Sequence, residues 1–289
     1  MSTRSGMEPV GRLDALLPPE MARRAEEVGV AKASLDLLSV FTLAVLAGAF
    51  IALGGVFATV ALAGAGSAPW GAIRVLAGLV FSLGLILVVV GGAELFTGNN
   101  LLAMAWAGRR IGARALFRNW AIVYVGNFVG AVATAMLVYG GGSYAFGAGA
   151  FGAAALGIAS AKLQLGFVQA VALGVLCNSL VCLAVWLTYS ARTTADRILA
   201  IVPPISAFVA AGFEHSVANM YFIPLGLFIA ALDPGFVAMS GLELQAQGLT
   251  WVGFLARNLL PVTIGNVIGG TLLVGAVYWF VYLRPRAKE

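Results

Sequence analysis

The chain has 289 residues, of which 61% are hydrophobic and only 10% are charged, and its formal net charge is +5 at pH 7. Soluble domains carry about 25% charged residues and about 45–50% apolar ones, so this composition excludes an ordinary water-soluble protein and indicates an integral membrane protein. The positive charge then indicates membrane orientation and contact with anionic lipid, and it gives no reason to expect a nucleic-acid partner.

The N-terminal 35 residues are polar and show no signal peptide, because they lack the apolar stretch that such a signal requires. Their basic residues are Arg4, Arg12, Arg23, Arg24 and Lys32. Pro18-Pro19 marks a helix start, since proline fits the first turn of a helix. We predict a cytoplasmic, partly amphipathic segment over residues 1–35.

Long uncharged runs predict six transmembrane helices, because a bilayer core needs about 20 apolar residues of helix. The predicted spans are 36–60, 74–107, 116–139, 163–190, 199–231 and 256–283. The second and fifth spans are interrupted by blocks that contain glycine and charged residues. The expected fold class is therefore all-α, integral to the membrane and multi-pass.

Lysine and arginine residues are divided unequally between the two sides of these spans. Fourteen lie in the N-terminal segment, the loops at 104–118 and 188–198, and the tail, whereas the other side has only Arg74, Lys162 and Arg257. Cytoplasmic loops of membrane proteins are enriched in Lys and Arg. We therefore expect both termini in the cytoplasm and the chain in a bacterial-type cytoplasmic (inner) membrane.

The two interruptions share the pattern Gly-x-Glu-x4-Asn, 120 residues apart. The first copy is Gly92, Glu94 and Asn99, and the second is Gly212, Glu214 and Asn219. Ionisable residues at membrane depth are costly and commonly mark a path for ions or polar substrates. Paired interruptions in two halves of a chain point to a transport site.

Each interruption is expected to break its helix. Glycine lets the backbone leave the helix in the first block, and in the second half we expect Pro203-Pro204 to disrupt the helix. The half-helix N-termini exposed at such breaks carry partial positive charge and free N–H groups, which favour anions.

A second internal repeat supports two related halves. Arg118-Asn119 and Gly126-Asn127-x2-Gly130 match Arg257-Asn258 and Gly265-Asn266-x2-Gly269. Three spans per half is an odd number, so the halves must be inverted, with the substrate path at their interface. The predicted organisation is a first three-helix repeat over 36–139, an extracytoplasmic linker over 140–162, a second, inverted repeat over 163–283 and a cytoplasmic tail over 284–289.

His215 is the only histidine of the chain and stands in the second block. A core histidine is the ordinary explanation, but this position favours a functional one, because an imidazole exchanges protons near neutral pH. For Glu94 and Glu214 we expect structural roles, either capping loop N–H groups or pairing with a basic residue. The asparagines expected to hydrogen-bond between helices or loops are Asn99, Asn127, Asn219 and Asn266.

Other chemistries find no support in the sequence. One histidine and two cysteines on different faces of one helix, Cys177 and Cys182, cannot supply a tetrahedral metal site. The chain has no phosphate-binding Gly-x4-Gly-Lys-Ser/Thr loop, and no nucleophile–base pair can be argued from spacing. We therefore expect no metal, no cofactor and no enzyme activity.

Four motifs together resemble the formate/nitrite transporter family over about residues 20–285. They are ELFTGN at 94–99, CN-x2-VCLAVW at 177–186, GFEHS-x-ANM at 212–220 and NL-x-PVTIGN at 258–266. The first motif looks most like the formate branch. The resemblance implies a homopentamer in which each protomer has an aquaporin-like six-helix fold and its own pore for small monovalent anions or their acids.

The resemblance also implies roles for individual residues. His215 corresponds to a pore histidine, Thr97 to a loop threonine close to it, and Asn178 to a pore asparagine. Lys162 matches a vestibule lysine that draws anions in. The positions expected to narrow the pore are Phe81, Leu85, Leu95, Phe96 and Phe208. By the predicted topology Phe81 and Leu85 lie on the external side of the break and Leu95 and Phe96 toward the cytoplasm, while Phe208 is assigned to neither gate.

The implied function is transport of small monocarboxylates, foremost formate, with a proton relayed at His215. Nitrite, lactate or acetate, and hydrosulfide are alternatives within the family, and a neutral-solute channel is a remote one. Protonating an acid of pKa about 4 at pH 7 costs about 4 kcal/mol, whereas an unpaired carboxylate in an apolar medium costs on the order of tens of kcal/mol. Passage as the neutral acid is therefore favoured, which makes the proton a second expected partner.

Overall fold

The computed structural model describes residues 15–66, 68–243 and 248–285. These residues form helices and no strands, and six of the helices are long and apolar enough to cross a membrane. They are Leu37–Leu62 (α2), Trp70–Gly91 (α3), Ala113–Gly140 (α5), Phe167–Thr188 (α7), Thr194–Ala211 (α8) and Trp251–Tyr282. The predicted all-α membrane fold with six spans is confirmed.

The sixth span is continuous but changes its helical type along its length. Its parts are α12 (Trp251–Gly253), η3 (Phe254–Leu259), α13 (Leu260–Val267), η4 (Ile268–Ala276) and α14 (Val277–Tyr282). Both η3 and η4 are π-helical, a wider winding that is rare in proteins and occurs frequently at functional sites.

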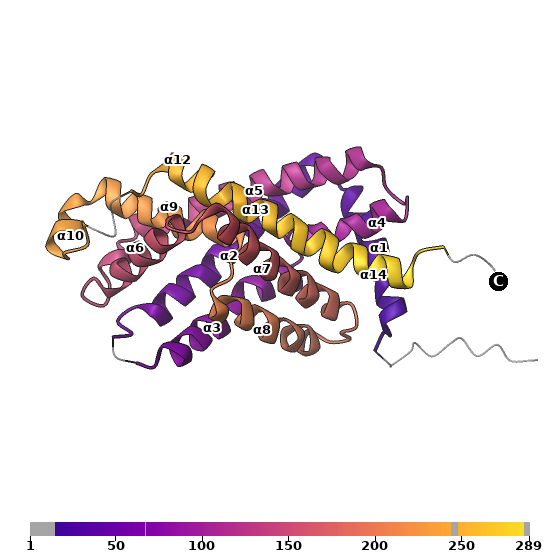
Figure 1. Ribbon diagram of the computed structural model, residues 1–289, viewed down its shortest axis with the longest axis horizontal. Coiled ribbons are helices and arrows are strands. Elements are labelled where there is room, and N and C mark those ends of the chain that lie inside the picture. The colour runs from indigo at the N-terminus through magenta and orange to yellow at the C-terminus, as the bar shows by residue number, and fades with distance from the viewer. Residues whose placement is uncertain (1–14, 67, 244–247, 286–289) are drawn as a thin grey trace, which may run out of the picture.

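Two ends of the bundle can be distinguished in Figure 1. Helix α1 (Pro18–Ala33) and α14 lie together at one end, which we call the terminus side. Helices α6 (Ala150–Leu163) and α10 (Pro234–Met239) lie at the opposite end, which we call the far side. The segment 140–162, which we expected to link the two repeats, contains most of α6, and α6 packs against α9 (Ser216–Leu232).

Each half contains a helix that stops inside the bundle. Helix α3 ends at Gly91 and is followed by a break, by η1 (Gly98–Leu101) and by α4 (Leu102–Ala107). Helix α8 ends at Ala211 and is followed by a break and by α9. Gly92 and Gly212 cap the two helices with φ of 79° and 76°, a left-handed conformation that glycine adopts at little cost. The predicted interruption of spans two and five is confirmed.

The prediction that Pro203-Pro204 breaks the fifth span is wrong. Both prolines lie inside α8, which continues to Ala211. The φ angle of proline fits a helix, so its lost N–H weakens the hydrogen-bond ladder without forcing the chain to turn. The helix ends only where Gly212 takes positive φ.

Close backbone contact joins equivalent helix pairs of the two halves. A Cβ added at Gly130 of α5 would overlap the Val45 carbonyl oxygen of α2, and one added at Gly269 of η4 would overlap the Val175 carbonyl oxygen of α7. Small residues permit this approach between membrane helices. Because Gly130 and Gly269 are repeat-related, the same packing occurs in both halves.

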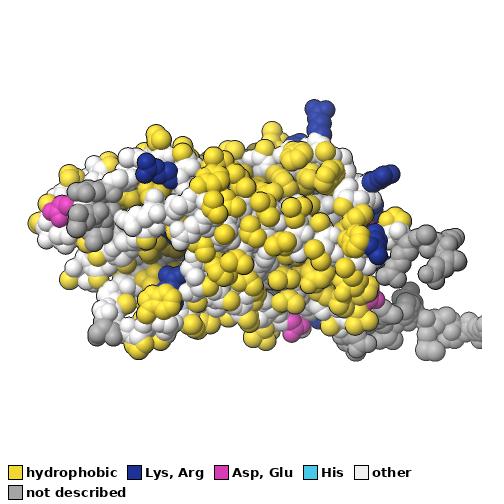
Figure 2. Space-filling model, in the orientation of Figure 1, with side chains coloured by type: hydrophobic (Ala, Val, Ile, Leu, Met, Phe, Trp, Pro, Cys, Tyr) yellow, Lys and Arg dark blue, Asp and Glu magenta, His cyan; other side chains and the backbone are white. Residues whose placement is uncertain are grey.

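The outer surface suits an apolar environment. Hydrophobic side chains cover much of the middle of the face in Figure 2, where few charged side chains are seen. Exposed hydrophobic residues include Phe57, Leu76, Val125, Leu187 and Leu273, from five different spans. An apolar surface of this extent indicates contact with lipid or with neighbouring protein.

Candidate functional site: two cavities and a thin barrier

Two cavities enter the bundle from opposite sides. The far-side cavity has a volume of about 600 Å³, and its lining includes Arg74, Phe81, Lys162, Phe208 and His215. The terminus-side cavity has a volume of about 550 Å³, and its lining includes Lys32, Leu85, Glu94, Leu95 and Asn99. No residue lines both of these cavities. The two cavities are therefore lined by separate sets of residues in this conformation.

The layer that separates the cavities is thin near α3. Phe81 lines the far-side cavity and Leu85 lines the terminus-side cavity, and each side chain is only 2% exposed. Four residues of helix rise about 6 Å, so the barrier here is about one side chain thick. The prediction that Phe81 and Leu85 lie on the same side is wrong, because Leu85 shares its cavity with Leu95.

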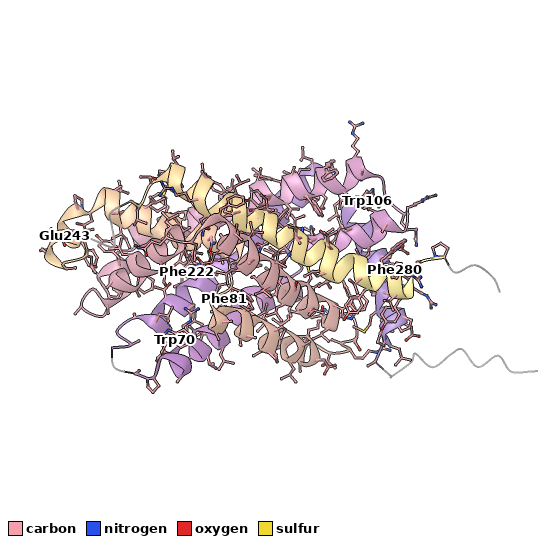
Figure 3. The ribbon with its side chains drawn as sticks, viewed as in Figure 1. Trp70, Phe81, Trp106, Phe222, Glu243 and Phe280 are labelled. Atoms are coloured by element: carbon pink, nitrogen blue, oxygen red, sulfur yellow. The ribbon has the colours of Figure 1, made fainter. Side chains whose placement is uncertain are left out.

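Aromatic rings form the far-side face of this barrier. The Phe81 ring meets the Phe208 ring edge-on with centroids 5.7 Å apart, and it stacks on Phe222 at 6.3 Å. Phe81 and Phe222 are labelled near the middle of Figure 3. Phe208 also stacks on the His215 ring at 5.8 Å. Phe208, which the sequence assigned to neither gate, therefore belongs to the far-side cavity.

Phe96 and Asn178 line neither cavity. The Phe96 ring packs edge-on against Trp120 and Tyr124, with centroids 6.2 and 4.8 Å away. The Asn178 side-chain amide donates to Asn100 Oδ1 at 2.8 Å and to the carbonyl oxygens of Thr97 and Asn266. Both side chains thus hold the first break in place, and they do so from inside the protein core.

His215 connects the second break to the first. It is the N-cap of α9, where its Nδ1 accepts a hydrogen bond from the Ala218 amide at 3.0 Å. Its Nε2 lies 2.9 Å from Thr97 Oγ1. Because a backbone amide can only donate, Nδ1 carries no hydrogen and the neutral imidazole carries its hydrogen on Nε2. The imidazole therefore donates to Thr97 Oγ1, which leaves the hydroxyl hydrogen of Thr97 for another acceptor.

Each break glutamate forms an ion pair with a lysine from outside its own break. Lys162 Nζ lies 2.7 Å from Glu214 Oε1, and Lys32 Nζ lies 3.0 Å from Glu94 Oε1. Both glutamate side chains are 5% exposed. A buried carboxylate requires such a partner. We expected these glutamates either to cap loop N–H groups or to pair with a basic residue, and the structure shows that both pair with a lysine.

Asparagines complete both clusters in the same way. The amides of Asn99 and Asn219 donate to Glu94 and Glu214 at 2.6 and 2.7 Å. They also donate to the side chains of Asn119 and Asn258 at 2.9 and 2.7 Å. Asn119 and Asn258, in turn, donate to the carbonyl oxygens of Lys32 and Lys162. The sequence singled out neither Lys32 nor these two asparagines as site residues, although the repeated Arg-Asn pair at 118–119 and 257–258 was the available signal.

The N-terminal amides of α9 were expected to be free for anions, and this is wrong for two of them. The Ser216 amide donates to Asn266 Oδ1 at 2.9 Å, and the Ala218 amide donates to His215. Asn266 also donates from its own amide to the Glu214 carbonyl oxygen at 2.9 Å. Buried backbone groups at membrane depth lack water to pair with, so side chains satisfy them. The Ser216 and Ala218 amides are therefore not available to bind an anion.

Within the described part of the chain, no group of three or more His, Cys, Asp or Glu side chains could hold a metal ion. Cys177 and Cys182 are both buried and unbonded to each other.

Comparison with known proteins agrees with this geometry. The sequence profile of the formate/nitrite transporter family matches residues 19–280. The formate channel FocA of Escherichia coli strain K12 is 46% identical, with 94% of this chain and 96% of FocA covered. The formate channel FocA of Haemophilus influenzae is 40% identical, with 90% and 93% covered.

Solved structures agree as well. A structure described as a pentameric formate channel with formate bound superposes with a TM-score of 0.81 at 42% identity, covering 86% of this chain and 98% of that one. A second, described as an ion channel of the same family, gives 0.76 at 28% identity, covering 91% and 98%. The six spans, the two helix breaks and these matches together show that the chain belongs to the formate/nitrite transporter family.

Proposed function

We propose that this protein is a homopentameric channel or transporter for formate, in which each protomer conducts through the two cavities described above. The observation that carries the proposal is the hydrogen-bonded Thr97–His215 pair beside a thin apolar barrier. Relatives named as formate channels, and a similar structure named as a pentameric one with formate bound, support both the substrate and the assembly. Nitrite, lactate or acetate, and hydrosulfide are the alternative substrates.

Formate crosses the barrier as formic acid. Basic side chains, Lys162 among them, draw the anion into the far-side cavity. The molecule then crosses an apolar constriction. Phe81 and Phe208 form its far-side face, and Leu85 and Leu95 form its terminus-side face. An apolar constriction penalises a bare carboxylate far more than it penalises the acid, so protonation before the constriction lowers the barrier.

His215 relays that proton, and Thr97 holds the imidazole in place. The His215 side chain lines the far-side cavity, whereas Thr97 is fully buried and lines neither cavity. A proton taken up from water in the far-side cavity binds Nδ1 of the neutral imidazole and breaks its bond to the Ala218 amide, because Nδ1 then becomes a donor. The imidazolium gives the same proton to formate. The products are formic acid and the starting neutral imidazole, so charge and protons balance, and Nδ1 can again accept from the Ala218 amide.

The proposed orientation places the termini and the terminus-side cavity in the cytoplasm. The described Lys and Arg residues outside this side are Arg74, Lys162 and Arg257, and the remainder lie near the terminus side. Positively charged segments are retained in the cytoplasm during insertion. The membrane proposed is the bacterial-type cytoplasmic membrane.

Flux of radiolabelled formate into liposomes that contain the purified protein tests the function. We expect uptake well above that of protein-free liposomes, accelerated by an inward proton gradient and reduced by excess unlabelled formate. Competition with nitrite, lactate and hydrosulfide ranks the substrates. Fast glycerol or water flux without formate flux would instead support the neutral-solute channel.

A further inference from the structure

The far-side cavity contains three charged side chains, and two of them neutralise each other. Lys162 and Glu214 form the ion pair at 2.7 Å. Arg74 is the third, and among the described residues no carboxylate lies within ion-pair distance of its guanidinium group. The net positive charge of this cavity therefore resides on Arg74.

Arg74 is held at the end of α8, next to the second break. Its Nε donates to the Ala210 carbonyl oxygen at 3.2 Å, and its Nη2 donates to the Val209 carbonyl oxygen. These carbonyls belong to the last turn of α8, which carries the partial negative charge of a helix C-terminus. Val209 and Gly212 line the cavity. Without a cation there, an anion approaching His215 would meet the negative end of α8.

The position of the guanidinium is fixed by α3. Arg74 lies one turn after Trp70, and its guanidinium carbon lies 6.0 Å from the centroid of the Trp70 ring. Trp70 is 75% exposed and is labelled toward the far side in Figure 3. Arg74 therefore places its charge on the wall of the far-side cavity, between the exposed Trp70 ring and the end of α8.

We propose that Arg74 is the residue that collects anions in the far-side cavity, by cancelling the negative end of α8 and supplying the cavity's net charge. Lys162 contributes less to the net charge of the cavity than Arg74 does, because Glu214 lies 2.7 Å from its ammonium group. This inference rests on the proposed function and assigns its anion attraction to a residue outside both repeated motifs.

The test compares Arg74→Gln, Arg74→Lys and, as a matched control, Arg257→Gln in formate-loaded liposome assays. Arg257 is a matched control because the charge pattern places it on the same side of the membrane as Arg74. Its side chain is exposed and lines neither cavity. At low ionic strength and low formate, we expect Arg74→Gln to reduce flux on the order of tenfold, since a charged cleft raises encounter rates by about 10-fold or more. Arg74→Lys should retain most of the flux, and Arg257→Gln should match the unmodified protein.

Salt separates an electrostatic role from a structural one. Raising ionic strength from 0.01 to 1 M shortens the screening length from about 30 to about 3 Å, so the deficit of Arg74→Gln should largely disappear. A deficit that persists at high salt and is shared by Arg74→Lys would assign Arg74 a structural role and overturn the inference. Unchanged flux in Arg74→Gln would overturn it as well. Absence of formate flux in the unmodified protein would instead reject the proposed function.

Discussion

Thr97 and His215 belong to different helix breaks, 118 residues apart in sequence, yet Thr97 Oγ1 and His215 Nε2 lie 2.9 Å apart. Thr97 lies in the break after α3, and His215 caps the helix that follows the break after α8. The inverted repeat thus brings its two breaks into direct hydrogen-bond contact. The Ala218 amide fixes the imidazole so that Nε2 is its donor.

Replacing Thr97 by valine tests this contact. Valine has nearly the same shape but no acceptor, so the buried Nε2–H would lose its partner at a cost of about 1–3 kcal/mol. We expect formate flux to fall by about tenfold or more in Thr97→Val, and to stay near normal in Thr97→Ser, which keeps the hydroxyl. Stopped-flow uptake in liposomes measures both. Equal flux in the two variants would show that the hydroxyl takes no part.

Two replacements of His215 separate its capping role from its proton exchange. Asparagine caps helices well, whereas replacing a cap by alanine costs about 1 kcal/mol. We therefore expect His215→Asn to melt near the unmodified protein and His215→Ala to melt lower. Both should lose proton-driven formate uptake, because neither side chain titrates near neutral pH. Full proton-coupled uptake in His215→Ala would reject the relay.

Much of the fold could be predicted because its main determinants are local. Apolar runs of sufficient length predict the six spans, and the repeated Gly-x-Glu-x4-Asn pattern predicts both breaks. The exact site of the second break could not be read, since both Pro203-Pro204 and Gly212 are helix-ending signals. Only the structure shows that the glycine ends α8 while the prolines remain within it.

The site was predictable in its central residues and less so in their partners. Of the residues that the resemblance singled out, His215 lines the far-side cavity, whereas Thr97, Phe96 and Asn178 are buried and line neither cavity. Lys32 lies in the polar N-terminal segment, and its contact with Glu94 depends on how α1 docks under the bundle. Such a long-range contact leaves no periodic signal in the sequence, and neither does the reach of Arg74 to α8.

The ion pair between Lys162 and Glu214 predicts a difference between single and double substitutions. Lys162→Met leaves a buried carboxylate without its cation, and breaking a buried pair costs about 3–5 kcal/mol. We expect Lys162→Met to lower the melting temperature strongly. The double variant Lys162→Met/Glu214→Gln should recover most of that loss, because glutamine keeps an oxygen for Asn219 and Asn258. Thermal unfolding in detergent compares the three proteins, and equal melting of the single and double variants would contradict the prediction.

The thin barrier at α3 predicts that one apolar side chain controls whether the cavities connect. Leu85 faces the terminus-side cavity one turn from Phe81, and both are nearly fully buried. Leu85→Ala removes three carbon atoms from a layer about 6 Å thick, which lets water reach from one cavity toward the other. A wetter constriction lowers the penalty for an unprotonated carboxylate. We therefore expect larger anion currents in planar bilayers, a weaker dependence of flux on the proton gradient, and leakage of chloride.

Leu53→Ala, which shortens an exposed leucine on α2 outside both cavities, is the matched control and should change none of these. If Leu85→Ala conducted no better than this control, the barrier would have to lie elsewhere along the path, with Phe208 and Leu95 as the next positions to shorten.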